Sequence, residues 1–88
     1  MLLSDYVDFG SRERALRILT ENGFELLKNG YGSIVPRERS PTYPASDLGP
    51  NACAYLFNGG SVVEFPTRKL PELAEAQARI RALAAASN

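Results

Sequence analysis

The stretch from residue 6 to residue 26, YVDFGSRERALRILTENGFEL, decides the fold. It opens within residues 3–9, where apolar and polar side chains alternate, and this alternation predicts a strand. Residues 12–22 then place apolar side chains on one stripe, with charged side chains largely opposite, and so predict an amphipathic helix. Ser11 has an N-cap side chain, and Gly23 can take the left-handed position that ends a helix.

Two hairpins are expected downstream of this unit. Asn29-Gly30 separates the strand-like runs 24–28 and 31–35, and Pro36 should end the second of them because it cannot donate to a ladder. The turn 58–60, Asn-Gly-Gly, separates strands predicted over 52–57 and 61–65; the register of 52–57 is open because both of its faces are apolar.

A long loop and a last helix complete the pattern. Residues 36–51 contain four prolines and show no period, so this segment is either functional or mobile. Residues 71–86 predict a helix with Pro71 in its first turn and an apolar stripe formed by Leu73, Ala76, Ile80 and Leu83. The order strand, helix, hairpin, long loop, hairpin, helix predicts an α+β fold with a mostly antiparallel sheet and two helices on one face. At 88 residues, the chain 1–88 makes a single domain.

Composition limits the function more firmly than any motif. The chain has no histidine and one cysteine, Cys53, so it cannot build a Ser-His-Asp or Cys-His catalytic arrangement, an intrachain disulfide or a Cys-rich zinc site. We therefore expect no enzyme, no metal and no cofactor, and we interpret Cys53 as a packed structural residue. Ten basic residues balance ten acidic ones, which argues against a nucleic-acid partner. We expect a cytoplasmic location with no membrane contact, because there is no signal peptide or long apolar run and a lone thiol fits a reducing compartment.

The second face of the predicted sheet carries more apolar side chains than a solvated face should. Such a patch on a small domain usually marks an interface or a ligand site, and we expect a homodimer or another partner there. Folding of the 36–51 loop over this face, or a ligand cavity, are the alternatives. The candidate interface residues are Tyr6, Leu27, Tyr43, Tyr55, Phe57 and Val62.

The turn between the first strand and the first helix is the candidate ligand site. Free N–H groups at a helix N-terminus favour a carboxylate or phosphate, although a plain strand-to-helix turn explains the same residues. The candidate ligand-binding residues are Asp8, Phe9, Gly10, Ser11 and Arg12.

Other charged groups have two interpretations each. Five arginines could form either an anion-binding clamp or a solvated surface with salt bridges: Arg12, Arg14, Arg17, Arg37 and Arg39. Likewise, Asp8 and Glu64 could face each other as paired carboxylates for acid/base chemistry, or each could be solvated separately.

Residues 6–26 resemble the opening strand-helix-strand of ACT domains, in which an amphipathic helix ending in Glu-Asn-Gly precedes the second strand; here that sequence is Glu21-Asn22-Gly23. The resemblance implies a ferredoxin-like fold that pairs with a second copy and binds amino acids near the first loop, which is Asp8 to Ser11 here. We therefore expect a non-enzymatic regulatory module that self-associates and binds a small anionic metabolite. The alternative is a protein–protein interaction module without a small ligand, using the apolar sheet face and the 36–51 loop.

Overall fold

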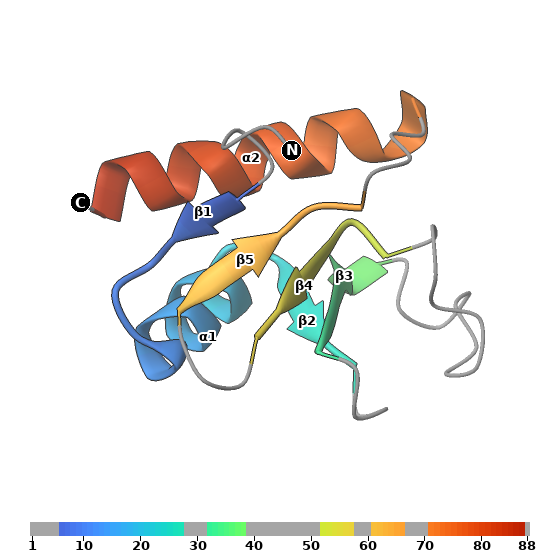
Figure 1. The fold of residues 1–88 in the computed structure, drawn as a ribbon. Coiled ribbons are helices and arrows are strands. Elements are labelled where there is room, and N and C mark those ends of the chain that lie inside the picture. Colours follow the sequence, from blue (N-terminus) through green and yellow to red (C-terminus); the bar gives the residue numbers. More distant parts are fainter. Residues whose placement is uncertain (1–5, 28–31, 39–51, 58–60, 67–70, 88) are drawn as a thin grey trace.

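The computed structural model describes residues 6–27, 32–38, 52–57, 61–66 and 71–87 and confirms the α+β class. Seven elements follow one another along the described chain: β1 (Tyr6–Asp8), α1 (Arg12–Glu21), β2 (Phe24–Leu26), β3 (Ser33–Pro36), β4 (Ala54–Leu56), β5 (Val62–Glu64) and α2 (Pro71–Ser87) (Figure 1). The predicted interval 39–51 of the long loop lies outside the described residues.

The five strands form one sheet in the order β1-β5-β4-β3-β2, and every neighbouring pair is antiparallel. Strands β2 to β5 run as a meander in which each strand pairs with the next, as the two predicted hairpins require. Helix α1 carries the chain from β1 at one edge to β2 at the other (Figure 1). Strand β1 therefore joins the sheet only through its pairing with β5.

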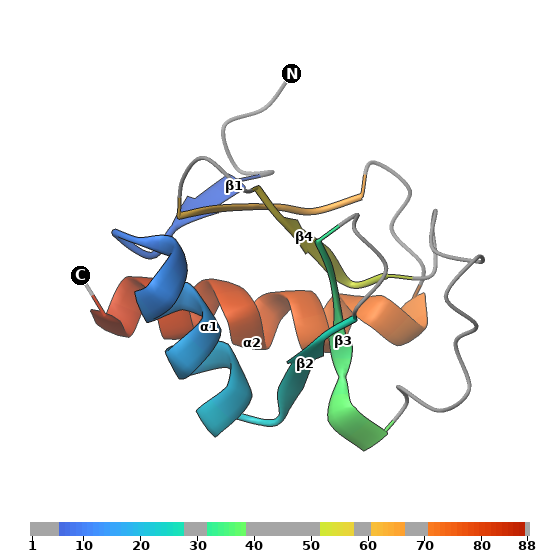
Figure 2. The same cartoon turned by 90° about the horizontal axis from the view of Figure 1, so that it is seen from below.

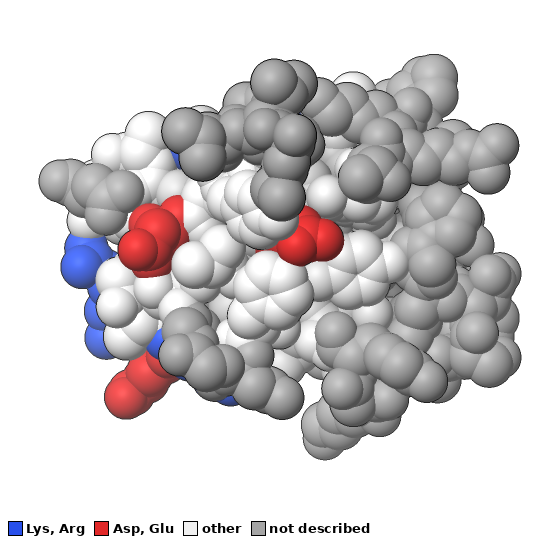
Figure 3. Space-filling model, viewed as in Figure 1, with Lys and Arg blue, Asp and Glu red and all other residues white. Residues whose placement is uncertain are grey.

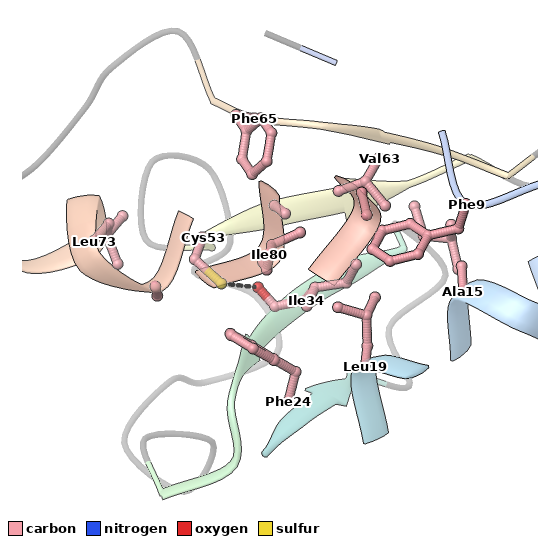
Figure 4. Packing of buried hydrophobic residues seen from close by; sticks show 14 residues of the cluster. Phe9, Ala15, Leu19, Phe24, Ile34, Cys53, Val63, Phe65, Leu73 and Ile80 are labelled. Atoms are coloured by element: carbon pink, nitrogen blue, oxygen red, sulfur yellow. Dashed lines mark hydrogen bonds between the residues drawn. The ribbon is translucent and has the colours of Figure 1, made fainter. Parts of the chain in front are cut away.

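Both helices lie on the same side of the sheet, as predicted (Figure 2). The strands send alternate side chains toward them, and Leu56 and Val63 are neighbours in the register on this side. The inward position of Leu56 settles the register left open for 52–57. The buried core consists of Phe9, Ala15, Leu19, Phe24, Ile34, Cys53, Ala54, Leu56, Val63, Phe65, Leu73, Ala76, Ile80 and Ala84 (Figure 4).

Helix α1 begins and ends as its sequence predicts. The Ser11 hydroxyl accepts a hydrogen bond from the Arg14 backbone N–H at 3.1 Å, which satisfies one donor of the first turn. Gly23 follows the C-cap with a φ of +90°, a conformation that glycine adopts without a steric penalty. The helix is one residue shorter than predicted because Asn22 already leaves the helical conformation.

Arginines distant in sequence bind the C-terminal carbonyls of both helices. Neither helix has a basic residue in its own last turn. Instead Arg79 of α2 donates to the Asn22 carbonyl at 3.1 Å, Arg37 donates to the Thr20 carbonyl, and Arg14 of α1 donates to the Ser87 carbonyl. Since helix C-termini carry partial negative charge, these contacts stabilise both ends. Arg14 and Arg37 thus each bind a helix carbonyl, a contact that the sequence did not predict, and the anion clamp and the salt-bridged surface both stay predictions.

Helix α2 buries Leu73, Ala76 and Ile80 of the predicted stripe, and Leu83 packs against the core partly buried. The helix also buries one polar side chain that the prediction missed. Gln77 is 1% exposed, and its Nε2 donates to the Cys53 carbonyl at 3.3 Å. The thiol of Cys53 donates in turn to the Ile34 carbonyl at 3.1 Å (Figure 4). Because Cys53 is fully buried in the core, its interpretation as a packed structural residue is confirmed.

The end of β3 differs from its prediction. Pro36 was expected to end the strand from outside, yet it is the last strand residue and pairs with Phe24 of β2. The ladder to β4 already stops at the pair Ile34 and Ala54, and Ala52 and Cys53 form a bend. The Pro36 nitrogen therefore faces no strand acceptor, so its missing N–H costs nothing there.

Candidate functional site

The side of the sheet that faces away from both helices is the candidate functional site, and we call it the open face. Side chains along a strand alternate between the two sides, and the register fixes which ones lie here. The predicted second-face residues all lie on the open face, and none of them is fully buried: Tyr6, Asp8, Glu25, Leu27, Tyr55, Phe57, Val62 and Glu64.

Exposure is uneven across the open face. Alternation also places Ser33 and Val35 of β3 on this side, but both are fully buried. Phe57, directly after β4, is 44% exposed and is the most exposed large hydrophobic side chain of the described residues. The accessible part of the open face therefore centres on β1, β5 and β4 rather than on β3.

A row of three side chains crosses this accessible part. Glu64 of β5 pairs with Tyr6 of β1 on one side and with Tyr55 of β4 on the other. Directly opposed residues of antiparallel strands have Cβ atoms about 5 Å apart, so the carboxylate lies between two phenol rings. Burial, and secondarily the charge of Glu64, raises the pKa of the Tyr55 phenol above its ordinary value. The row therefore combines a negative charge with two aromatic groups.

The charge of the open face has one sign. Asp8, Glu25 and Glu64 lie on it, and none of its described positions holds lysine or arginine. Among the described residues, Figure 3 shows this side as uncharged groups interrupted by acidic ones, with basic groups mainly at the left margin. The described arginines belong to α1, α2 and the residue after β3. The open face is thus both apolar and acidic.

The turn before α1 is closed by hydrogen bonds of its own. The Asp8 carboxylate accepts from the Gly10 backbone N–H at 2.9 Å and from the Ser61 hydroxyl. Phe9 is fully buried in the core, so only its backbone could meet a ligand here. The Asp8 carboxylate therefore already binds the Gly10 N–H, a donor that an anionic ligand would use. Ligand binding by residues 8–12 stays a prediction.

These contacts predict a pH-dependent stability. The Ser61 hydroxyl, and secondarily the Gly10 N–H, lower the pKa of Asp8 below its ordinary value. Because the pKa is lower in the folded than in the unfolded chain, Asp8 stabilises the fold above its unfolded pKa, and this contribution disappears as the pH falls through the folded pKa. In Ser61→Ala we expect the Asp8 pKa to rise toward its ordinary value, measured by NMR titration of the carboxyl carbon.

Ser11→Ala is the matched control for this titration. It removes a hydroxyl of the turn before α1 that binds the Arg14 N–H and not Asp8. The Asp8 pKa should not change in this variant. An equal change in both variants would show that the hydrogen bond from Ser61 does not set the pKa.

The two carboxylates considered as a catalytic pair are not directly opposed. Asp8 pairs with Val62, whereas Glu64 pairs with Tyr6, which places the two acids diagonally on the face. Within the described ranges, no group of three or more His, Cys, Asp and Glu side chains could hold a metal ion. No helix in the described part of the chain has the length and apolar character to cross a membrane.

Several predicted features lie outside the described residues, among them the turn residues Asn29, Gly30 and 58–60. Tyr43, a predicted interface residue, is one of them, and Arg39 is another. Of the 36–51 segment, only Pro36 in β3 and the short turn at Arg37 and Glu38 are described. Ser61 was not singled out from the sequence, where a serine before a strand gives no sign that it will bind Asp8.

Comparisons with protein-family models, with curated proteins and with solved structures found no match to the chain. The resemblance of residues 6–26 to ACT domains therefore stays a prediction.

Proposed function

We propose that this protein is a non-enzymatic protein-binding module whose open face contacts a partner protein. The observation that supports the proposal best is the exposed Phe57, which lies beside the partly buried Tyr55 and Val62 on the open face. Exposed aromatic and aliphatic side chains grouped on one face are typical of interaction surfaces. Tyrosine is also enriched in such surfaces, because its ring buries apolar area while its hydroxyl keeps a polar contact.

A second candidate function is binding of a small anionic metabolite at residues 8–12. One observation favours it: the Nη1 nitrogen of Arg12, in the first turn of α1, is buried without a hydrogen-bond partner. The Asp8 carboxylate in the same turn works against an added anion, because the two negative charges would repel each other. We therefore rank this function second.

Self-association through the open face is disfavoured by the same charges. A symmetric dimer places the same patch of both copies in contact. The acidic patch that carries Asp8, Glu25 and Glu64 would then face a copy of itself. Like charges opposed at an interface cost several kcal/mol, on the order of the net stability of a small domain. A partner of different sequence fits this face better than a second copy.

Peptide selection tests the proposed function. A random peptide library displayed on phage should yield binders of the wild-type protein, and Phe57→Asp should lose most of their binding because it adds a charge to the exposed apolar part of the face. Arg17→Asp, an exposed change on α1, is the control and should bind as the wild type does. Failure to enrich any binder, or equal binding by both variants, would reject the open face as the contact surface.

A further inference from the structure

The two helices are joined by two arginine contacts that run in opposite directions. Arg14, near the start of α1, donates from its side chain to the Ser87 carbonyl in the last turn of α2. Arg79 of α2 donates to the carbonyl of Asn22, the C-cap of α1, at 3.1 Å. The same number of residues separates the two contacts along each helix. The helices are therefore held at two points, and a rotation about one contact breaks the other.

Each helix supplies a donor that the end of the other helix lacks. The last carbonyls of a helix have no donor within the helix, and they carry partial negative charge. Neither helix has a basic residue in its own last turn. The side chains of Asn22 and Ser87 bind carbonyls further back in their own helices, those of Ile18 and Ala84. The last turn of each helix therefore depends on an arginine of the other.

The contact made by Arg79 reaches the first residue of β2. Its guanidinium carbon lies over the ring of Phe24, 4.8 Å from the centroid. Phe24 is fully buried and begins β2 directly after the turn that ends α1. A guanidinium over an aromatic face adds an attraction to that of its hydrogen bond. Arg79 thus fixes the place where α1 ends and β2 begins.

Helix α1 has little of its own to keep it in place. It has ten residues, and only Ala15 and Leu19 are fully buried. Isolated helices of this length are marginal in water, so tertiary contacts supply most of their stability. Helix α2 has 17 residues and buries a longer apolar stripe. Loss of α2 would remove from α1 both the donor at its C-cap and the acceptor of Arg14.

We infer that α1 and α2 form a reciprocal latch: they leave the sheet together, as one cooperative unit, and neither leaves alone. Proteins open in such units at a lower free energy than global unfolding requires. This unit covers the core side of the sheet, and its release uncovers Leu56, Val63 and Phe65. The inference goes beyond the proposed protein-binding function, which concerns the opposite side of the sheet.

Native-state hydrogen exchange of the full chain at low urea concentrations tests the latch. In the wild type, interior amides of α1 and α2 should share one opening free energy, lower than that of β4 and β5. Ala82→Gly, an exposed change on α2 alone, should lower the protection of both helices by the same factor, about fivefold. Arg17→Gly, an exposed change on α1 alone, should do the same.

Two further variants test the arginine contacts themselves. Arg79→Met and Arg14→Met each keep an apolar side chain but lose the guanidinium. Each should lower the protection of both helices at least roughly threefold, and the double variant should show the product of the two factors. Arg17→Met removes the same group from an exposed position on α1 and is the matched control, which should show no loss. Arg79→Lys, which keeps the charge and a donor, should restore part of the protection.

The other outcomes overturn the inference. Different opening free energies for α1 and α2, or a loss confined to the helix that carries the substitution, would show that the helices open separately. An opening free energy shared with β4 and β5 in the wild type would show that the domain opens only as a whole. Unchanged protection in Arg79→Met and Arg14→Met would show that these contacts do not hold the unit. Amide spectra that match the wild type away from the substitution establish that each variant folds.

Discussion

Replacing Gly32 by alanine is expected to lower the free energy of unfolding by about 2–4 kcal/mol. Gly32 has a φ of +74°, and a Cβ built on it would lie 2.2 Å from the carbonyl oxygen of Leu56. The Leu56 N–H donates to the Gly32 carbonyl at 2.8 Å, so the two backbones cannot separate without losing this hydrogen bond. For 88 residues a total stability of roughly 4–13 kcal/mol is typical, and the substitution removes a large part of it.

Gly23→Ala is the control that separates the cost of the steric clash from the cost of the left-handed backbone conformation. Gly23 also has a positive φ, but a Cβ there would meet only the flexible end of Arg79 at 3.4 Å. Its substitution should cost about 1 kcal/mol, from the left-handed conformation alone. Urea unfolding followed by circular dichroism measures both variants. Equal losses for Gly23→Ala and Gly32→Ala would mean that the approach of β3 to β4 is not as close as described.

Phe9→Ala is expected to cost about 3–5 kcal/mol, because it deletes a fully buried aromatic side chain. Phe9 follows β1 directly, and its backbone N–H donates to the Ser61 carbonyl at 3.0 Å. Its ring packs in the core near Ala15 of α1 and Val63 of β5 (Figure 4). A cavity there would loosen the contacts between the first strand, the first helix and the sheet.

Phe57→Ala is the matched control for Phe9→Ala. It makes the same chemical change on a side chain that is 44% exposed, so the loss should stay below about 1 kcal/mol. Thermal and urea unfolding of the two variants gives the comparison. A loss as large for Phe57 as for Phe9 would show that Phe57 is a core residue, and it would remove the main support for the open face as a binding surface.

The sequence predicts the elements well where a local signal exists. Alternation, helical spacing and the cap residues Ser11 and Gly23 locate both ends of α1, because these signals depend on neighbouring residues only. The Asn-Gly turns indicate the two hairpins, and their strands pair as predicted. The strands are shorter than their apolar runs, since regular pairing ends where the partner bends away, as the chain does at Ala52 and Cys53. Cys53 still donates its N–H to the Ile34 carbonyl at 3.0 Å, but the ladder does not continue past Ala54.

Features that depend on distant residues are not predictable from local signals. The sequence offers Gly30 as the turn glycine, but nothing in it shows that Gly32 will lie against Leu56 of another strand. Nor does it show that Ser61 will bind Asp8, which is 53 residues away. The same holds for the row of the open face: the alternation places Tyr6, Tyr55 and Glu64 on one side, but only the strand order makes them neighbours.

The pairing of β1 with β5 has a consequence for folding kinetics. Strands β2 to β5 can form hairpin by hairpin, whereas β1 has to wait for β5, the last of the described strands along the chain. Pairing of distant segments closes a large loop before it gains contacts, and such a topology slows folding. On the ribosome, the first strand therefore remains an unpaired edge until most of the sheet has emerged.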